Sequence, residues 1–132
     1  PDQTYVLNTG SPHYVKLLDH LPDNIKTSGA EIRYSEDYKQ EGINVNFVKI
    51  NQHNIEVATY ERGVEDETLS CGTGVTAAAI ATYLNKQDNN NLVNIQTKGG
   101  QLSVSFEQDG HSFKNIWLTG PATKVFDGEV DI

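Results

Sequence analysis

The sequence contains no methionine and a single cysteine, and both scarcities narrow what the chain can be. One thiol cannot form an internal disulfide, which favours a reducing compartment, with the cytoplasm as the default. The start of the chain lacks the basic flank and hydrophobic core of a signal peptide, and no apolar run approaches the roughly 20 residues that cross a bilayer. We therefore expect a soluble protein without membrane contact. The missing initiator methionine suggests a piece of a longer protein.

Basic residues are also few. The formal charge is −8, and the ten Lys and Arg residues are scattered, so nucleic acid is not an expected partner. No GxGxxG opens a helix and no phosphate loop is present, which leaves nucleotide cofactors without support. The spacing of the histidines suggests no metal, and none is assigned.

The apolar residues that are present follow two periods. Short alternating runs predict strands, and these runs lie at 4–10, 12–18, 43–50, 54–60, 91–97, 101–108 and 113–120. Residues 23–34 predict a short helix with Asp23 as its cap, although Gly29 weakens the pattern. Residues 72–85 are apolar nearly all round, which is typical of a helix buried on every side. DNNN at 88–91 is expected to end that helix on the surface. The 132 residues fit one domain, in which a mostly β structure wraps around this helix.

Cys71 lies directly ahead of the central helix, in the stretch YERGVEDETLSCGTG. The free N–H groups and the dipole of a helix start stabilise a thiolate there. The N–H groups of Gly72, Thr73 and Gly74 could also bind a small carboxylate, with the glycines allowing close approach. The alternative, a cysteine that is simply a small buried hydrophobe, stays open.

Four further residues are candidates for ligand contacts. Arg62 suits bidentate recognition of a carboxylate, and Glu61 could hold an ammonium group or tune the thiol. His13 is a candidate acid, base or orienting group, and Asn44 could point its amide at a ligand. The alternatives are a solvated ion pair for Glu61 and Arg62, a loop histidine for His13 and an ordinary polar strand face for Asn44.

Four ordered motifs resemble the carboxy-terminal half of diaminopimelate epimerase. These motifs are NTGSPHYV at 8–15, INVNFV at 43–48, YERGVEDETLSCGTG at 60–74 and GPATKVFDG at 120–128. The resemblance implies an α+β fold, a mixed, barrel-like β-sheet around one central buried helix. It also implies that residues 1–132 form a single carboxy-terminal domain whose amino-terminal partner domain is absent. In that family two such domains, related by pseudo-twofold symmetry, enclose the active site.

The implied activity is an isomerase reaction of lysine biosynthesis and peptidoglycan precursor supply. It interconverts LL- and meso-diaminopimelate without pyridoxal phosphate or metal, using one cysteine from each domain. By resemblance, the catalytic residues are Cys71, Glu61 and His13. The substrate-binding residues are Ser11, Asn44, Glu61, Arg62, Gly72 and Thr73.

Two departures from the family pattern concern the site. Ser11 stands where many members have Asn, and VEDET is one residue longer than the commoner VGET. Because the second cysteine is missing, the chain alone is expected not to epimerise. Self-association as a homodimer is left open. The alternatives are a cysteine-nucleophile hydrolase, a proline racemase-like or phenazine biosynthesis-like isomerase, and a non-catalytic binding domain.

Overall fold

The computed structural model of the chain describes residues 3–69, 71–86, 91–120 and 124–131, the last range for its backbone alone. Within these ranges the chain forms nine strands and two helices. In chain order they are β1 (Gln3–Asn8), β2 (Pro12–Leu18), α1 (Ile25–Arg33), β3 (Asn44–Ile50), β4 (Ile55–Glu61), β5 (Asp66–Thr68), α2 (Gly72–Lys86), β6 (Leu92–Thr97), β7 (Gly100–Asp109), β8 (Ser112–Thr119) and β9 (Lys124–Asp131).

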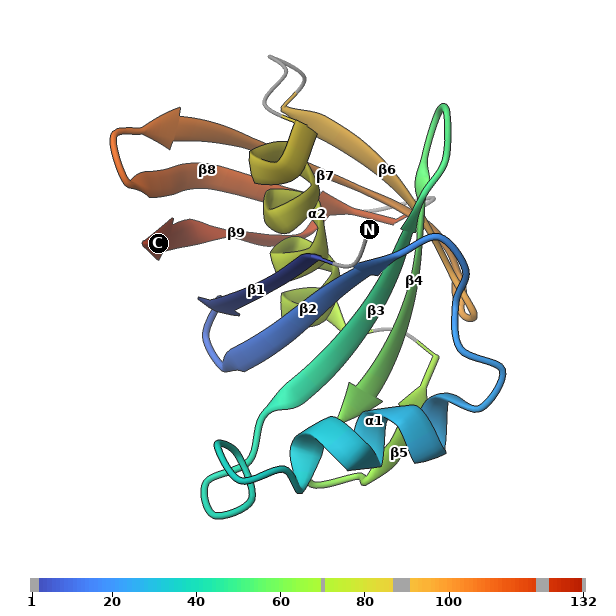
Figure 1. Ribbon diagram of the computed structural model, residues 1–132. Coiled ribbons are helices and arrows are strands. Elements are labelled where there is room, and N and C mark those ends of the chain that lie inside the picture. The colour runs from blue at the N-terminus through green and yellow to red at the C-terminus, as the bar shows by residue number, and fades with distance from the viewer. Residues whose placement is uncertain (1–2, 70, 87–90, 121–123, 132) are drawn as a thin grey trace.

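The strands form one mixed sheet that curls around α2 (Figure 1). Its order is β1-β2-β3-β4-β6-β7-β8-β9, with the short β5 paired to β4. Two pairs of neighbouring strands are parallel, β2 with β3 and β4 with β6, and the other pairs are antiparallel. A parallel pair needs a crossover, and α1 and α2 lie in these two crossovers. The predicted α+β fold, a mixed sheet wrapped around one central helix, is confirmed.

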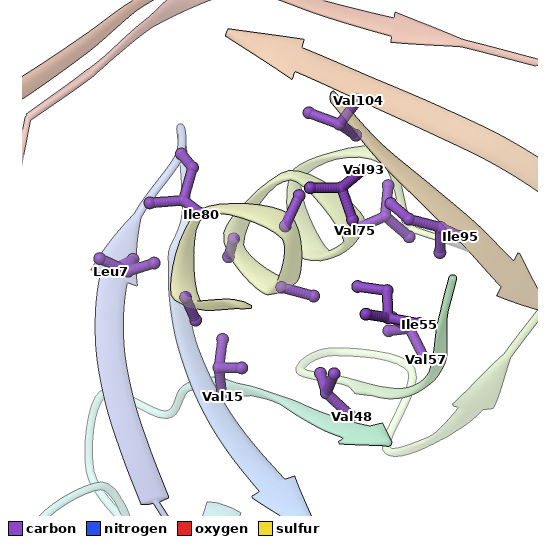
Figure 2. Close-up of a cluster of buried hydrophobic side chains, with 14 of the residues drawn as sticks. Leu7, Val15, Val48, Ile55, Val57, Val75, Ile80, Val93, Ile95 and Val104 are labelled. Atoms are coloured by element: carbon purple, nitrogen blue, oxygen red, sulfur yellow. The ribbon is translucent and has the colours of Figure 1, made fainter. Parts of the chain in front are cut away.

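The main core lies between α2 and the concave face of the sheet. Every residue of α2 from Gly74 to Thr82 is buried, which confirms the prediction of a helix that is apolar on all sides. Figure 2 shows the aliphatic side chains that surround it, including Leu7 from β1, Val48 from β3 and Val104 from β7. The run of alanines allows this close packing because their side chains take little room.

A second, smaller core lies on the outer face of the sheet under α1. It includes Ile25 from the helix, Val45 and Phe47 from β3, and Tyr60 from β4. A Cβ at Gly29 would lie 2.4 Å from the Cβ of Tyr60, so glycine is what allows α1 to pack this closely. The residue that weakens the helical pattern is therefore required by the packing.

The N-cap of α1 differs from the prediction. Asn24, in an extended conformation, accepts a hydrogen bond from the N–H of Thr27 at 3.0 Å, so the assignment of Asp23 as the cap was wrong. Either residue type can cap a helix, and the helix register decides which one does.

The predicted strands are confirmed with shifts of one or two residues at their ends, but β5 and β9 were not predicted. The expected end of α2 at 88–91 falls largely outside the described residues, as does part of the motif at 120–128. Neither helix in the described part of the chain is long and apolar enough to cross a membrane.

Candidate functional site

On the inner face of the sheet, the buried side chains change from apolar to polar at the end that lies beside the start of α2. Further along the same strands, inward side chains such as Val15, Val48 and Val57 belong to the main core. At this end the buried inward side chains are polar, namely His13 on β2, Asn44 and Asn46 on β3, and Thr59 on β4. The pairings His13 with Asn44 and Asn46 with Thr59 place them side by side.

Cys71 lies directly before the first residue of α2, as predicted. Its carbonyl accepts the N–H of Val75 at 2.8 Å, the first bond of the helix, so Cys71 occupies the N-cap position. Its side chain is half-buried, and Sγ lies 3.5 Å from Oγ1 of Thr73. The thiol is thus held at the positive end of the helix dipole.

Thr73 connects this helix start to the β1–β2 turn. Its Oγ1 lies 2.8 Å from Nε2 of His13 and 3.3 Å from Oγ of Ser11, and its carbonyl accepts the hydroxyl of Thr9 at 2.8 Å. Oγ of Ser11 lies 3.2 Å from Nε2 of the same histidine. Ser11 is therefore part of this cluster.

His13 is fully buried on β2 and is not a loop histidine. Its Nδ1 lies 2.9 Å from Nδ2 of Asn46, and its Nε2 faces Thr73. Burial, followed by the positive charge of Arg62, lowers the pKa of His13 to about 4. The ring is therefore neutral at pH 7, and it reaches Cys71 only through the Thr73 hydroxyl. Because both ring nitrogens are engaged, the geometry does not favour the direct Cys–His pair of a cysteine hydrolase.

The Asn44 side chain joins two loops. Its Oδ1 accepts the N–H of Arg62 at 2.8 Å, and its Nδ2 donates to the carbonyl of Pro12 at 3.0 Å and toward Oγ of Ser11 at 3.4 Å. It is only 5% exposed. These contacts fix the turn before β2 relative to the turn after β4, so Asn44 positions Ser11 and Arg62 whether or not it also touches a ligand.

Glu61 and Arg62 lie at the end of β4 and are half-buried. Nη1 of Arg62 donates to the carbonyl of Glu41 at 3.0 Å, beside a hollow of about 390 Å³ that Pro12, Glu41 and Arg62 help to line. Glu36 and Asp37 line this hollow as well, so Arg62 faces acidic neighbours there and the hollow by itself does not favour an anionic ligand.

Glu65 explains how the longer VEDET turn is accommodated. It adopts a left-handed conformation, φ 58°, and its carboxylate accepts the hydroxyls of Tyr60 at 2.7 Å and Tyr34 at 2.9 Å, Nε of Arg33 at 3.3 Å and the N–H of Gly63 at 3.0 Å. Partial desolvation alone would raise the pKa of Glu65, but these donors and the Arg33 charge outweigh it and lower the pKa to about 2. The turn that contains Glu65 is thus anchored to α1 and β4, beside Glu61 and Arg62.

The two glycines after Cys71 have different surroundings. A Cβ at Gly74 would lie 2.6 Å from Oδ1 of Asn46 and 3.2 Å from Cε1 of His13, so glycine here allows the helix start to pack on that pair. The expectation that Gly74 leaves room for a ligand was wrong, because protein atoms fill that space. Gly72 is exposed, and its backbone is accessible.

Two members of the cluster and one residue of the neighbouring turn were not found from the sequence. Asn46, Thr59 and Glu65 were not singled out, although the polar residues in the apolar strand INVNFV were the available signal for Asn46. In the described ranges no group of three or more His, Cys, Asp or Glu side chains could hold a metal ion.

Comparison with known proteins identifies the family of the chain. A family model described as diaminopimelate epimerase matches residues 5–125. A diaminopimelate epimerase of Flavobacterium psychrophilum is 51% identical over 96% of this chain and 50% of its own length. One of Aquifex aeolicus is 42% identical over 94% of this chain and 44% of its own length. The chain spans about half the length of the curated relatives it matches.

Solved structures support the fold alone. A phenazine biosynthesis protein of the PhzF family from Enterococcus faecalis superposes on 85% of this chain and 42% of its own chain, with a TM-score of 0.65 and 13% identity. At 13% identity this similarity does not indicate an activity. The sequence relatives and the family model, in contrast, name the same family. The chain belongs to the diaminopimelate epimerase family.

Proposed function

We propose that this chain supplies one half of the active site of a diaminopimelate epimerase, which interconverts LL- and meso-diaminopimelate. The observation that carries the proposal is Cys71 at the N-cap of α2, in a chain of this family. Because the chain spans about half of its relatives, we further propose that it is the carboxy-terminal domain and acts with an amino-terminal one.

The proposed chemistry is proton exchange at an α-carbon. The Cys71 thiolate takes the α-proton, so an S–H bond forms and the C–H electron pair stays on carbon. A thiol on the opposite face, supplied by the other domain, donates a proton to that carbon and inverts it. This chain has one cysteine and cannot supply both groups.

The helix start supports this chemistry. Negative charge develops toward the α-carboxylate as the proton leaves, and donors placed there in advance lower the barrier. The backbone N–H groups of Gly72 and Thr73, in the first turn of α2, are suited to that carboxylate. They require no cofactor for this task.

The remaining candidates suit the other end of the substrate. Arg62 offers a charged fork for the distal carboxylate, and Glu61 an acceptor for an ammonium group. Asn44 and Ser11 belong to the same bonded cluster and hold this part of the site in place. His13 acts on Cys71 through Thr73, as a positioning residue.

A chimera tests the proposal. The half of the Flavobacterium psychrophilum relative that this chain does not match is joined to residues 1–132, and the two isomers are separated chromatographically after incubation with either one. We expect conversion in both directions by the chimera, and none by its Cys71→Ala variant or by the chain alone. A folded chimera that converts neither isomer would contradict the proposal and favour a non-catalytic domain.

A further inference from the structure

We infer that Asn46 fixes the tautomer of His13 and thereby aims the hydroxyl proton of Thr73 at Sγ of Cys71. The inference rests on the proposed function for its catalytic meaning, but its structural content can be tested without substrate. It makes Asn46 and Thr59 positioning residues that act on the thiol from within the core.

The orientation of the Asn46 amide follows from its neighbours. One end of the amide faces the carbonyl of Tyr14 at 3.3 Å, and a carbonyl can only accept, so that end is the NH₂ group. The other end, Oδ1, accepts the hydroxyl of Thr59 at 2.8 Å. The side chain is fully buried, and a Cβ on Gly74 would lie 2.6 Å from this Oδ1, so the amide is packed against the start of α2.

The orientation of the amide decides where the His13 proton lies. The same NH₂ group lies 2.9 Å from Nδ1 of His13, and Nδ1 must accept from it. A neutral imidazole with an accepting Nδ1 carries its proton on Nε2. The lowered pKa of His13 agrees with a ring that stays neutral. Two hydroxyl oxygens lie beside Nε2, Oγ1 of Thr73 at 2.8 Å and Oγ of Ser11 at 3.2 Å, and Nε2–H donates to the nearer one, Thr73.

The hydroxyl of Thr73 is then free to donate. Its oxygen already accepts from His13, so its own proton turns to one of two acceptors, Sγ of Cys71 at 3.5 Å or Oγ of Ser11 at 3.3 Å. A thiolate carries a full charge and is the stronger acceptor of the two. With the opposite tautomer, His13 would take the Thr73 proton, and the sulfur would lose this donor.

The first test is the ¹⁵N spectrum of the imidazole of His13 in the unmodified chain at pH 7. We expect Nδ1 to give the signal of an unprotonated nitrogen and Nε2 that of a protonated one. A protonated Nδ1 would overturn the inference, whatever the epimerisation assay gives.

The second test measures the rate at which iodoacetamide alkylates Cys71 at a fixed pH. One hydrogen bond fewer to the thiolate should slow alkylation about two- to tenfold in Thr73→Val and in Asn46→Leu. Because both residues act through one bond, the double variant should be no slower than the slower single variant. Thr82→Val is the matched control, since it removes a buried α2 hydroxyl that donates to Ala78, and it should leave the rate unchanged.

Two results of the alkylation series would overturn the inference. One is an unchanged rate in folded Thr73→Val, and the other is additive slowing in the double variant. If Asn46→Leu does not fold, the spectrum of the unmodified chain and the Thr73→Val rate still decide. Loss of epimerisation in the chimera with the expected tautomer in place would count against the proposed function and not against this arrangement.

Discussion

Acidification from pH 7 to pH 5 should lower the free energy of unfolding by about 2 kcal/mol through His13 alone. In the unfolded chain this histidine has its ordinary pKa of 6.5, whereas burial and the nearby Arg62 lower the pKa to about 4 in the folded chain. Between these values the unfolded chain binds a proton that the folded chain does not. Stability is therefore complete above pH 6.5 and is lost as the pH falls toward 4.

The magnitude follows from the two pKa values. The whole difference between them corresponds to about 3 kcal/mol, and the part that falls between pH 7 and pH 5 is about 2 kcal/mol. No discount for solvent screening applies, because the His13 side chain is fully buried. The lower limit of pH 5 also keeps the measurement above the range in which Glu65 begins to contribute.

Urea unfolding at pH 7, 6 and 5 measures this effect, with the m-value as a check that the unfolded state is unchanged. The variant His13→Gln should be less stable at pH 7 but should lose the slope that His13 contributes. The control His53→Gln removes an exposed histidine and should keep the slope. Equal slopes in the unmodified chain and in folded His13→Gln would show that protonation of the buried His13 ring is not linked to unfolding.

Two further predictions concern the frame around the site. Gly29→Ala should lower the free energy of unfolding by about 3 kcal/mol, because the added Cβ would lie 2.4 Å from the Cβ of Tyr60. The control Ser28→Ala, in the same helix, should change the free energy of unfolding by no more than about 0.5 kcal/mol. Similar losses in the two variants would contradict the packing argument. Glu65→Gln should cost about 1–2 kcal/mol at pH 7, since the lowered pKa corresponds to about 3 kcal/mol before the 30% exposure of the side chain is allowed for. That difference should shrink as the pH falls from 4.5 toward 2, and a difference independent of pH would show that the carboxylate charge is not responsible.

The sequence predicted the parts of the fold that local pattern determines. The helix that is apolar on all sides could only be buried, and the alternating runs could only be strands, so the wrapped architecture followed. The strand β5 has three residues, too few for a period to show, and its pairing with β4 depends on the turn that Glu65 anchors. The role of Gly29 depends on a residue 31 positions away and cannot be read from the helix itself.

The candidate site was predictable in its location and less so in its bonding. The position of Cys71 at the helix start followed from local sequence. The polar cluster behind it needed the register of three strands, which brings His13, Asn46 and Thr59 together from separate motifs. Asn46 lies in an apolar strand and resembles any polar residue on a strand face, so only the structure reveals that both ends of its amide are bonded within the core.

Solvent deuterium incorporation at the α-carbon of both diaminopimelate isomers tests whether Cys71 exchanges the α-proton. It reports proton removal itself, even where inversion is not completed. We expect the chimera to incorporate deuterium into either isomer and to invert it, and its Cys71→Ala variant not to invert either isomer. A folded chimera that incorporates no deuterium, or whose inversion rate is unchanged by Cys71→Ala, would contradict the claim that Cys71 is one of the two thiols that exchange the α-proton.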